Sequence, residues 1–240
     1  MSKLGRISWF ERMLREMPDS ELSIRDLLLE EPNVDRFIIS LVEQSPSVYG
    51  NAYSRSYAEQ AYDEPEAAYT FGHNRRGGFE AMLRREAVKA GLLATTEYTE
   101  RTHTPYVMVR AGRFLLTESH VQCAGEVPPA ARFREQNAAV NALLMRGSLP
   151  FAEFDPLKLY ELSEANGIYG IVSHGAHTEN AKSPSFMHLV FPSEDCTRLV
   201  ETIDLFALRL EMLARAKKIA ETEIAVDVAL PKVKRKGEGQ

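Results

Sequence analysis

The chain of 240 residues has the composition of an ordinary globular protein, with 44% hydrophobic and 26% charged residues, which excludes a fully disordered chain. Its formal net charge of -5 argues against a protein that coats nucleic acid with a broadly basic surface, but it is compatible with a local basic patch. Two cysteines without CxxC spacing form no disulfide framework, and the lack of an apolar run of about 18 residues predicts a soluble, cytoplasmic protein that makes no membrane contact.

Residues 1–48 predict an N-terminal helical cap of three short helices, with Pro18 and Pro32 between them. The third helix has the plainest pattern, because its apolar residues recur at i, i+3, i+4, i+7 and i+8 from Val34 to Val42. Ser45-Pro46-Ser47 is expected to end this helix, because proline removes a backbone donor from a helix interior.

Residues 49–78 predict a Tyr/Arg-rich loop segment, in which a short helix begins at about Ser54. Aromatic rings stack on unpaired bases and arginines neutralise phosphates, so this composition suits nucleic acid. The alternative is a loop whose tyrosines pack over the core and keep their hydroxyl groups in water. The residues predicted to bind nucleic acid are Tyr53, Tyr57, Arg55, Arg75, Arg76 and Arg84.

Residues 79–221 predict an α/β core. The expected elements are a helix over 79–90, strands over 92–99, 105–110 and 113–122, a helix over 129–145, strands over 167–173 and 185–191, and a long helix over 193–218. Residues 222–240 predict a short strand and a basic tail. The expected fold is therefore α/β or α+β, with the helical cap, a mixed sheet of five or six strands, and a long C-terminal helix.

The element order αβββαβ from residue 79 resembles the core of restriction-endonuclease-like nucleases. That resemblance implies an acidic residue near the start of the second strand, and Glu-x-Lys or an equivalent on the third, which together bind magnesium and activate water. The third strand offers Glu118 as a metal ligand with His120 at the lysine position, and Glu80 fits the helix carboxylate. The likeness covers about 110 residues, and the second strand, Thr104 to Met108, has no aspartate, which puts catalysis in doubt.

Histidines near two later strands suggest a zinc site, if the strands pair and the chain turns at Gly175. These candidate ligands are His174, His177 and His188. Nucleophilic catalysis by Ser119 or Ser173 is excluded, because each precedes a histidine directly and adjacent strand residues point to opposite faces.

Three function classes follow, in this order. The first is a nucleic-acid-associated binding or regulatory protein without an evident catalytic motif, with DNA or RNA as its partner. The second is a structural or interaction protein, such as a homo-oligomer formed through the 193–218 helix, whose surplus of apolar residues also fits burial within its own domain. The third is a metal-dependent nuclease. An enzyme ranks last, so no cofactor is expected, and a divalent metal is left open.

Overall fold

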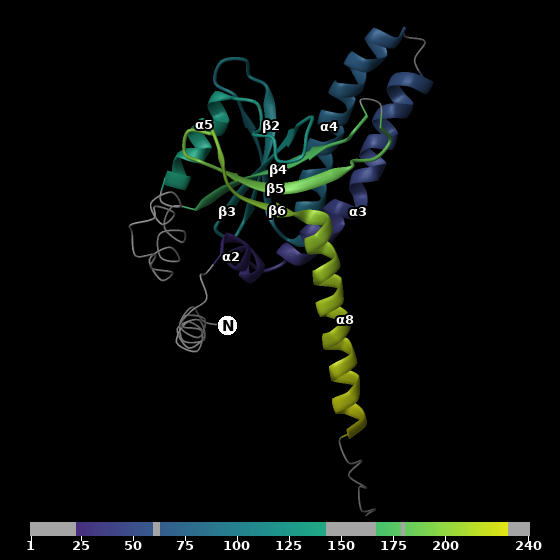
Figure 1. The fold of residues 1–240 in the computed structure, drawn as a ribbon, viewed down its shortest axis with the longest axis vertical. Helices are drawn as coiled ribbons and strands as arrows, with labels where there is room; N and C mark the ends of the chain where they lie inside the picture. The colour runs from purple at the N-terminus through teal and green to yellow at the C-terminus, as the bar shows by residue number, and fades with distance from the viewer. Residues whose placement is uncertain (1–22, 60–62, 143–166, 179–180, 230–240) are drawn as a thin grey trace, which may run out of the picture.

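The structure, a computed structural model, describes residues 23–59, 63–142, 167–178 and 181–229 (Figure 1). It is an α+β fold in which six strands form one mixed sheet, as the sequence predicts. In the chain, helices precede the first strand and a helix follows the last one. The helices are α2 (Ile24–Glu30), α3 (Val34–Tyr53), the π-helix η1 (Ser54–Ala58), α4 (Glu64–Ala90), α5 (Arg132–Ala138), the 3-10 helix η2 (Ala139–Asn141) and α8 (Leu205–Ala229). The strands are β1 (Leu93–Tyr98), β2 (Pro105–Ala111), β3 (Phe114–His120), β4 (Ile168–Gly175), β5 (Phe186–Pro192) and β6 (Leu199–Asp204).

The strands lie in the sheet in the order in which they occur in the chain. All neighbouring strands pair antiparallel except β3 and β4, which run parallel and are joined by the connection that contains α5. Strands β1, β3 and β4 therefore point in the same direction. Their carboxyl ends lie at one edge of the sheet, which is where ligands bind in many open sheets.

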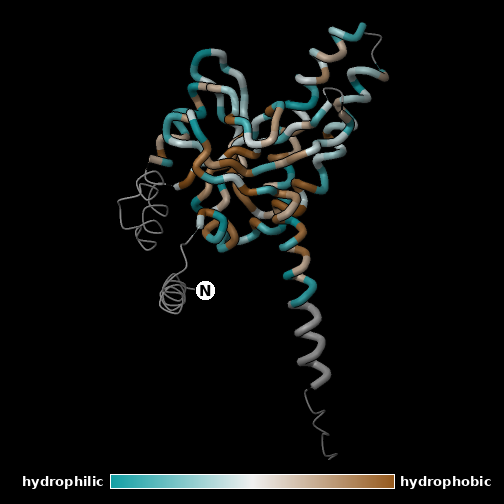
Figure 2. The backbone as a smooth tube through the Cα atoms, in the orientation of Figure 1, coloured by the Kyte–Doolittle hydropathy of each residue, from teal (hydrophilic) through white to brown (hydrophobic). Residues whose placement is uncertain are grey.

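Helices cover both faces of the sheet. Phe114 and Leu116 point from β3 into the main core with the apolar faces of α2, α3, α4 and the start of α8, whereas Tyr169 and Ile171 of β4 pack with Ala138 of α5 on the other face. Hydrophobic residues accordingly concentrate in the middle of the molecule (Figure 2). Helix α8 extends away from the sheet on one side of the molecule, and the last turns of α3 and the first turns of α4 project on the opposite side (Figure 1). Within the described residues, no helix is long and apolar enough to cross a membrane.

The predicted end of a helix at Pro46 is wrong, because α3 continues through this proline to Tyr53. Proline has no N–H to donate to the carbonyl four residues earlier, which here belongs to Val42. The hydroxyl of buried Ser45 donates to that carbonyl over 2.9 Å. The side chain therefore replaces the missing backbone donor, and the helix is not interrupted.

The predicted loop over 49–78 is also wrong, because this segment contains the end of α3, the π-helix η1 and the first half of α4. Helix α4 includes glycines that were expected to lie outside it. At Gly78 a Cβ atom would stand 3.0 Å from Cγ1 of Val48, so the absence of a side chain lets α4 approach α3 closely. Close packing of the two helices thus outweighs the low helix propensity of glycine.

The predicted helix over 193–218 begins at Leu205 instead, after strand β6. A turn precedes that strand, in which the carboxylate of Asp195 accepts hydrogen bonds from the hydroxyl groups of Ser193 and Thr197. Asp204 caps the helix by accepting from the backbone N–H groups of Phe206 and Ala207. The strand predicted for 223–230 is wrong, because helix α8 continues to residue 229.

Candidate functional site

Buried polar side chains gather where the carboxyl ends of β3 and β4 meet α3 and α4. The parallel register places His120 of β3 beside His174 of β4, and Glu118 lies one pleat earlier on the same face. Glu80 of α4 and Tyr49 of α3 reach this face of the sheet from the helix layer. The chain thus brings Glu80, Glu118 and His120, which the sequence singled out, into one cluster.

A continuous series of hydrogen bonds runs through this cluster. The hydroxyl of Tyr49 lies 2.8 Å from Nδ1 of His174, and Nε2 of the same ring lies 3.1 Å from Oε2 of Glu118. Glu118 is hydrogen-bonded to Glu80, whose Oε2 accepts from the backbone N–H of Val107 over 2.5 Å. The series links α3, β4, β3, α4 and β2, so it fixes the helix layer in place on the sheet.

Glu80 and Glu118 hold one proton between them near neutral pH. Burial raises the pKa of each carboxyl to about 7, and the proximity of Glu118 raises the pKa of Glu80 further. Because two such close carboxylates cannot both ionise cheaply, the pair titrates as one unit. The shared proton therefore belongs to the pair, and the nearby guanidinium of Arg76 opposes the effect of burial on both carboxyls.

The histidines of the cluster are neutral. Burial lowers the pKa of His174 well below its usual value and that of His120 to about 3, and the positive charge of Arg75 acts in the same direction. A neutral His174 with its proton on Nε2 donates to Glu118 and accepts from the hydroxyl of Tyr49. The ring of Phe79 stacks on His174 with centroids 3.6 Å apart, which holds the imidazole in this orientation.

Arg75 brings a buried positive charge next to the cluster. Its guanidinium lies over the rings of Tyr49 and Phe71, at 5.4 and 5.0 Å from their centroids. Its Nε has no hydrogen-bond acceptor among the described residues, and burial lowers the pKa of the group. Cation–π contacts therefore replace hydrogen bonds for part of this side chain.

A groove of about 290 Å³ lies beside the cluster, between the β1–β2 hairpin and α5. We call it the hairpin groove and define it by Arg76, Tyr98, Arg101, Tyr106, Arg132 and Phe133. Tyr106 and Phe133 stack with centroids 4.3 Å apart, which attaches α5 to the sheet. Arg76 connects the groove to the cluster, since its Nε lies 4.0 Å from Oε1 of Glu80.

The hairpin that forms one wall of the groove is internally hydrogen-bonded. The hydroxyl groups of Thr99 and Thr104 each lie 2.8 Å from that of Thr102, and the backbone N–H of Thr104 donates to the hydroxyl of Thr99. Across the groove, Arg132 of α5 lies 3.6 Å from the carboxylate of Glu100 in the hairpin. An exposed ion pair thus faces across the groove, and the hairpin wall has hydrogen bonds of its own.

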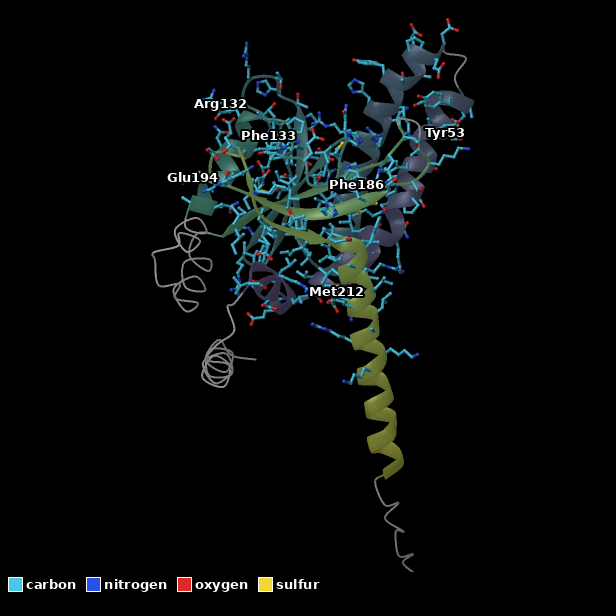
Figure 3. The ribbon with its side chains drawn as sticks, in the orientation of Figure 1. Tyr53, Arg132, Phe133, Phe186, Glu194 and Met212 are labelled. Atoms are coloured by element: carbon cyan, nitrogen blue, oxygen red, sulfur yellow. The ribbon has the colours of Figure 1, made fainter. Side chains whose placement is uncertain are left out.

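The residues predicted to bind nucleic acid are spread over the molecule. Tyr53 and Tyr57 stack on each other and pack against the main core, and Tyr53 lies across the molecule from Arg132 and Phe133 (Figure 3). Arg75 is buried, and Arg84 donates to the hydroxyl of Thr96 on β1. Arg55 is exposed on η1, so of these residues Arg76 alone lines the hairpin groove.

The residues at the β1–β2 connection and at the start of α5 were not predicted from the sequence as site residues. A basic and aromatic loop between two predicted strands, from Tyr98 through Arg101 to Thr104, is the signal that was available for the first wall. Nothing in the sequence places Arg132 and Phe133 opposite this loop, because their position depends on the crossover between β3 and β4.

The metal sites considered from the sequence do not match the geometry. The antiparallel register pairs His188 with Ser173, so His188 lies on the face opposite to His174, and His177 lies beyond β4 at the surface. In the part of the chain that the structure describes, no group of three or more His, Cys, Asp or Glu side chains is placed to hold a metal ion. Glu80 and Glu118 without an acid on β2 do not fit the magnesium site that the nuclease resemblance implies.

Comparison with known proteins finds no matching family model, no similar curated protein and no similar solved structure. The resemblance in element order therefore has no relative to support it.

Proposed function

We propose that this protein binds nucleic acid through the hairpin groove. The observation that carries the proposal is that Arg76, Arg101 and Arg132, from three separate elements, line one groove together with aromatic side chains. All the lining residues lie in the described part of the chain, and Glu100 is the one acidic residue among them. The lining therefore combines net positive charge with aromatic surface, the two properties that bind phosphates and bases.

A local basic groove reconciles this function with the net charge of -5. The negative charge elsewhere repels phosphate, so binding is confined to the groove and depends strongly on salt. Arginine suits such a site because its planar guanidinium forms paired hydrogen bonds with phosphate oxygens.

The buried cluster supports binding better than cleavage. Glu118 is buried beneath α4 and hydrogen-bonded to His174 and Glu80, so its carboxyl group already has hydrogen-bond partners. With the metal-ligand set incomplete, we assign this cluster to holding the groove in shape. Arg76 is the side chain through which it acts on the groove, because it is paired with Glu80.

The proposal is tested by fluorescence anisotropy with a labelled 20-nucleotide DNA or RNA at several salt concentrations. Replacing Arg101 and Arg132 by alanine is expected to weaken binding and to reduce the slope of log K against log salt by about 0.7 for each lost contact with single-stranded phosphate. The matched control replaces Arg55 and Arg84, which are exposed arginines outside the groove. Equal loss in both variants, or no binding at low salt, contradicts the proposal.

Self-association through α8 is a second candidate, favoured by the exposure of Leu210 and Leu213, which are 63% and 38% exposed on this helix. Isolated helices are marginally stable in water, so a helix that extends from the domain gains from a partner. Light scattering tests this candidate. A dimer that Leu210→Glu dissociates supports it, and a wild-type monomer at high concentration contradicts it.

A further inference from the structure

We propose that the hairpin groove accepts one unpaired nucleotide, so that the protein selects single-stranded over duplex nucleic acid. This inference rests on the proposed function and specifies its substrate class. It is carried by the size of the groove, by the exposure of Tyr98 and by the hydrogen bonds within the hairpin wall.

The groove has the dimensions of a site for one small unit. Its volume of about 290 Å³ lies at the lower end of the range for ligand pockets. A base and its sugar are a unit of this scale, whereas a paired helix presents a convex backbone that does not enter a small concave site. The shape therefore matches a base that has been freed from its partner.

Tyr98 provides an open stacking surface at the rim of this site. It is the last residue of β1, and its side chain is 62% exposed although it lies in the groove lining. Exposed aromatic rings are the surfaces on which single-stranded nucleic-acid binders stack successive bases. Phe133 adds a half-buried ring that stacks on Tyr106 and lies near the guanidinium of Arg134.

The arginines of the hairpin groove are placed to bind the phosphate of a nucleotide whose base lies in the groove. Arg101 belongs to the hairpin and Arg132 to the start of α5, so the two walls each contribute one exposed arginine. The threonine hydroxyl bonds between Thr99, Thr102 and Thr104 fix the hairpin before any ligand arrives. Because the hairpin wall is already hydrogen-bonded, the groove loses little conformational entropy on binding. One nucleotide of a longer strand can therefore bind there with few contacts.

Duplex nucleic acid is disfavoured because its bases are stacked and paired. To occupy the groove, a base would have to leave the helix, which costs a few kcal/mol in unstacking and unpairing. The arginines still attract duplex phosphates, so weak, salt-dependent duplex binding persists without a contribution from Tyr98.

The experiment compares three labelled ligands by anisotropy: a thymidine oligonucleotide, a strand of the same length with abasic sugars throughout, and the thymidine strand paired with its complement. Each is measured with the wild type, Tyr98→Ala and Tyr98→Phe, and with Tyr69→Ala as a matched control. Tyr69 is 72% exposed on α4 and lies outside the groove lining. Thermal melts establish that each variant is folded.

The wild type is expected to prefer the thymidine strand to the other two ligands. Tyr98→Ala is expected to weaken binding of this strand about 5- to 150-fold, the factor that corresponds to one base–aromatic stack. Tyr98→Phe and Tyr69→Ala should bind like the wild type. Binding of the abasic strand should not change on Tyr98→Ala, because it has no base to stack.

Two other results overturn the inference and are distinguishable. If duplex binds as tightly as single strand and Tyr98→Ala has no effect, while loss of Arg101 and Arg132 weakens both, binding of an unpaired base in the groove is refuted and nucleic-acid binding stands. If none of the ligands binds at low salt, the proposed function fails as well.

Discussion

Arg76 is tethered to Glu80, its Nε lying 4.0 Å from the carboxyl Oε1, so the hairpin groove and the buried cluster share one contact. An ionised Glu80 attracts the guanidinium and competes with a phosphate for it. A protonated Glu80 leaves Arg76 available to a ligand. The protonation of the carboxyl pair therefore controls part of the positive charge that the groove presents.

Nucleic-acid binding is expected to strengthen as the pH falls through about 7, the pKa to which burial raises Glu80 and Glu118. Glu80→Gln removes the competing charge, so it should bind a few-fold more tightly than the wild type at pH 8 and equally at pH 6. Anisotropy across this range checks the prediction. An identical pH profile in Glu80→Gln, which retains every histidine, would assign the pH dependence to other groups.

The same carboxyl pair is expected to make the protein less stable as the pH rises. The pKa of Glu118 in the folded state, about 7, exceeds the ordinary value of 4.5, so the folded state binds more protons between these values. The contribution of the pair is fully present below pH 4.5 and is lost as the pH rises through about 7. In the wild type, the free energy of unfolding should fall with pH, and Glu118→Gln should reduce this fall by about 1–3 kcal/mol. Urea unfolding at several pH values measures the difference.

The buried histidines act in the opposite direction and define the useful window. Burial lowers the pKa of His120 to about 3 and that of His174 well below its usual value. Their contribution is present above pH 6.5, the ordinary value, and is lost as the pH falls towards about 3. Between about pH 6.5 and 7.5 the histidines no longer contribute to the slope, so the last part of the carboxyl loss is seen there alone. Parallel profiles of the wild type and Glu118→Gln in this range would contradict the assignment.

Removal of the Tyr49 hydroxyl is expected to destabilise the fold. Tyr49→Phe leaves Nδ1 of the buried His174 ring without its partner, which costs about 1–3 kcal/mol because a desolvated polar atom is not satisfied elsewhere. Tyr53→Phe, on the same helix, is the matched control and should change stability by less than about 0.5 kcal/mol. Equal effects of the two changes in chemical unfolding would show that the hydrogen bond is unimportant.

The sequence predicted the central elements of the fold well, because their patterns are local. The run that contains Glu118 and the run that ends just before His174 were recognised as strands, and Glu80 was placed on the helix before them. What the sequence does not contain is the sheet order. The parallel register of β3 with β4 brings His174 next to Glu118, although the chain separates them widely, and local patterns do not encode such pairings.

The errors in the helices have a related cause. The glycines at 72, 77 and 78 were placed in a loop, and the proline at 46 was interpreted as the end of a helix, in agreement with their low helix propensities. In the structure, the close approach of Val48 to Gly78 and the bond from Ser45 to the carbonyl of Val42 compensate at Gly78 and at Pro46. The long apolar pattern from residue 193 was predicted to be one helix, but the structure divides it between β6 and α8. A few Leu, Val and Ile residues fit the period of a strand as well as that of a helix.

Removal of divalent cations is expected to leave nucleic-acid binding unchanged. The carboxyls of Glu80 and Glu118 are hydrogen-bonded to each other, and Glu118 is also bonded to His174. Among the described residues, no group of three or more His, Cys, Asp or Glu side chains is placed to hold a metal ion. Anisotropy with and without EDTA checks this expectation at constant ionic strength. Magnesium-dependent cleavage of the ligand that Glu118→Gln abolishes would instead favour the nuclease hypothesis.

The proline inside α3 gives a prediction about the fold alone. Ser45→Ala is expected to destabilise the protein by about 1–3 kcal/mol, because the buried carbonyl of Val42 loses its donor and Pro46 has no N–H to replace it. In a Pro46→Ala background the backbone N–H of residue 46 is restored, so the same serine change should cost less. Ser47→Ala, at an exposed position of the helix, is the control.

Urea unfolding of the four proteins in this cycle measures the coupling between the two positions. A coupling of about 1 kcal/mol or more supports a side-chain donor that substitutes for a backbone donor. Additive effects would mean that Ser45 stabilises the helix by packing instead. Since α3 carries Tyr49 in the turn after Pro46, a bent or frayed α3 would also displace the hydroxyl that orients His174, and the serine change should then weaken nucleic-acid binding along with stability.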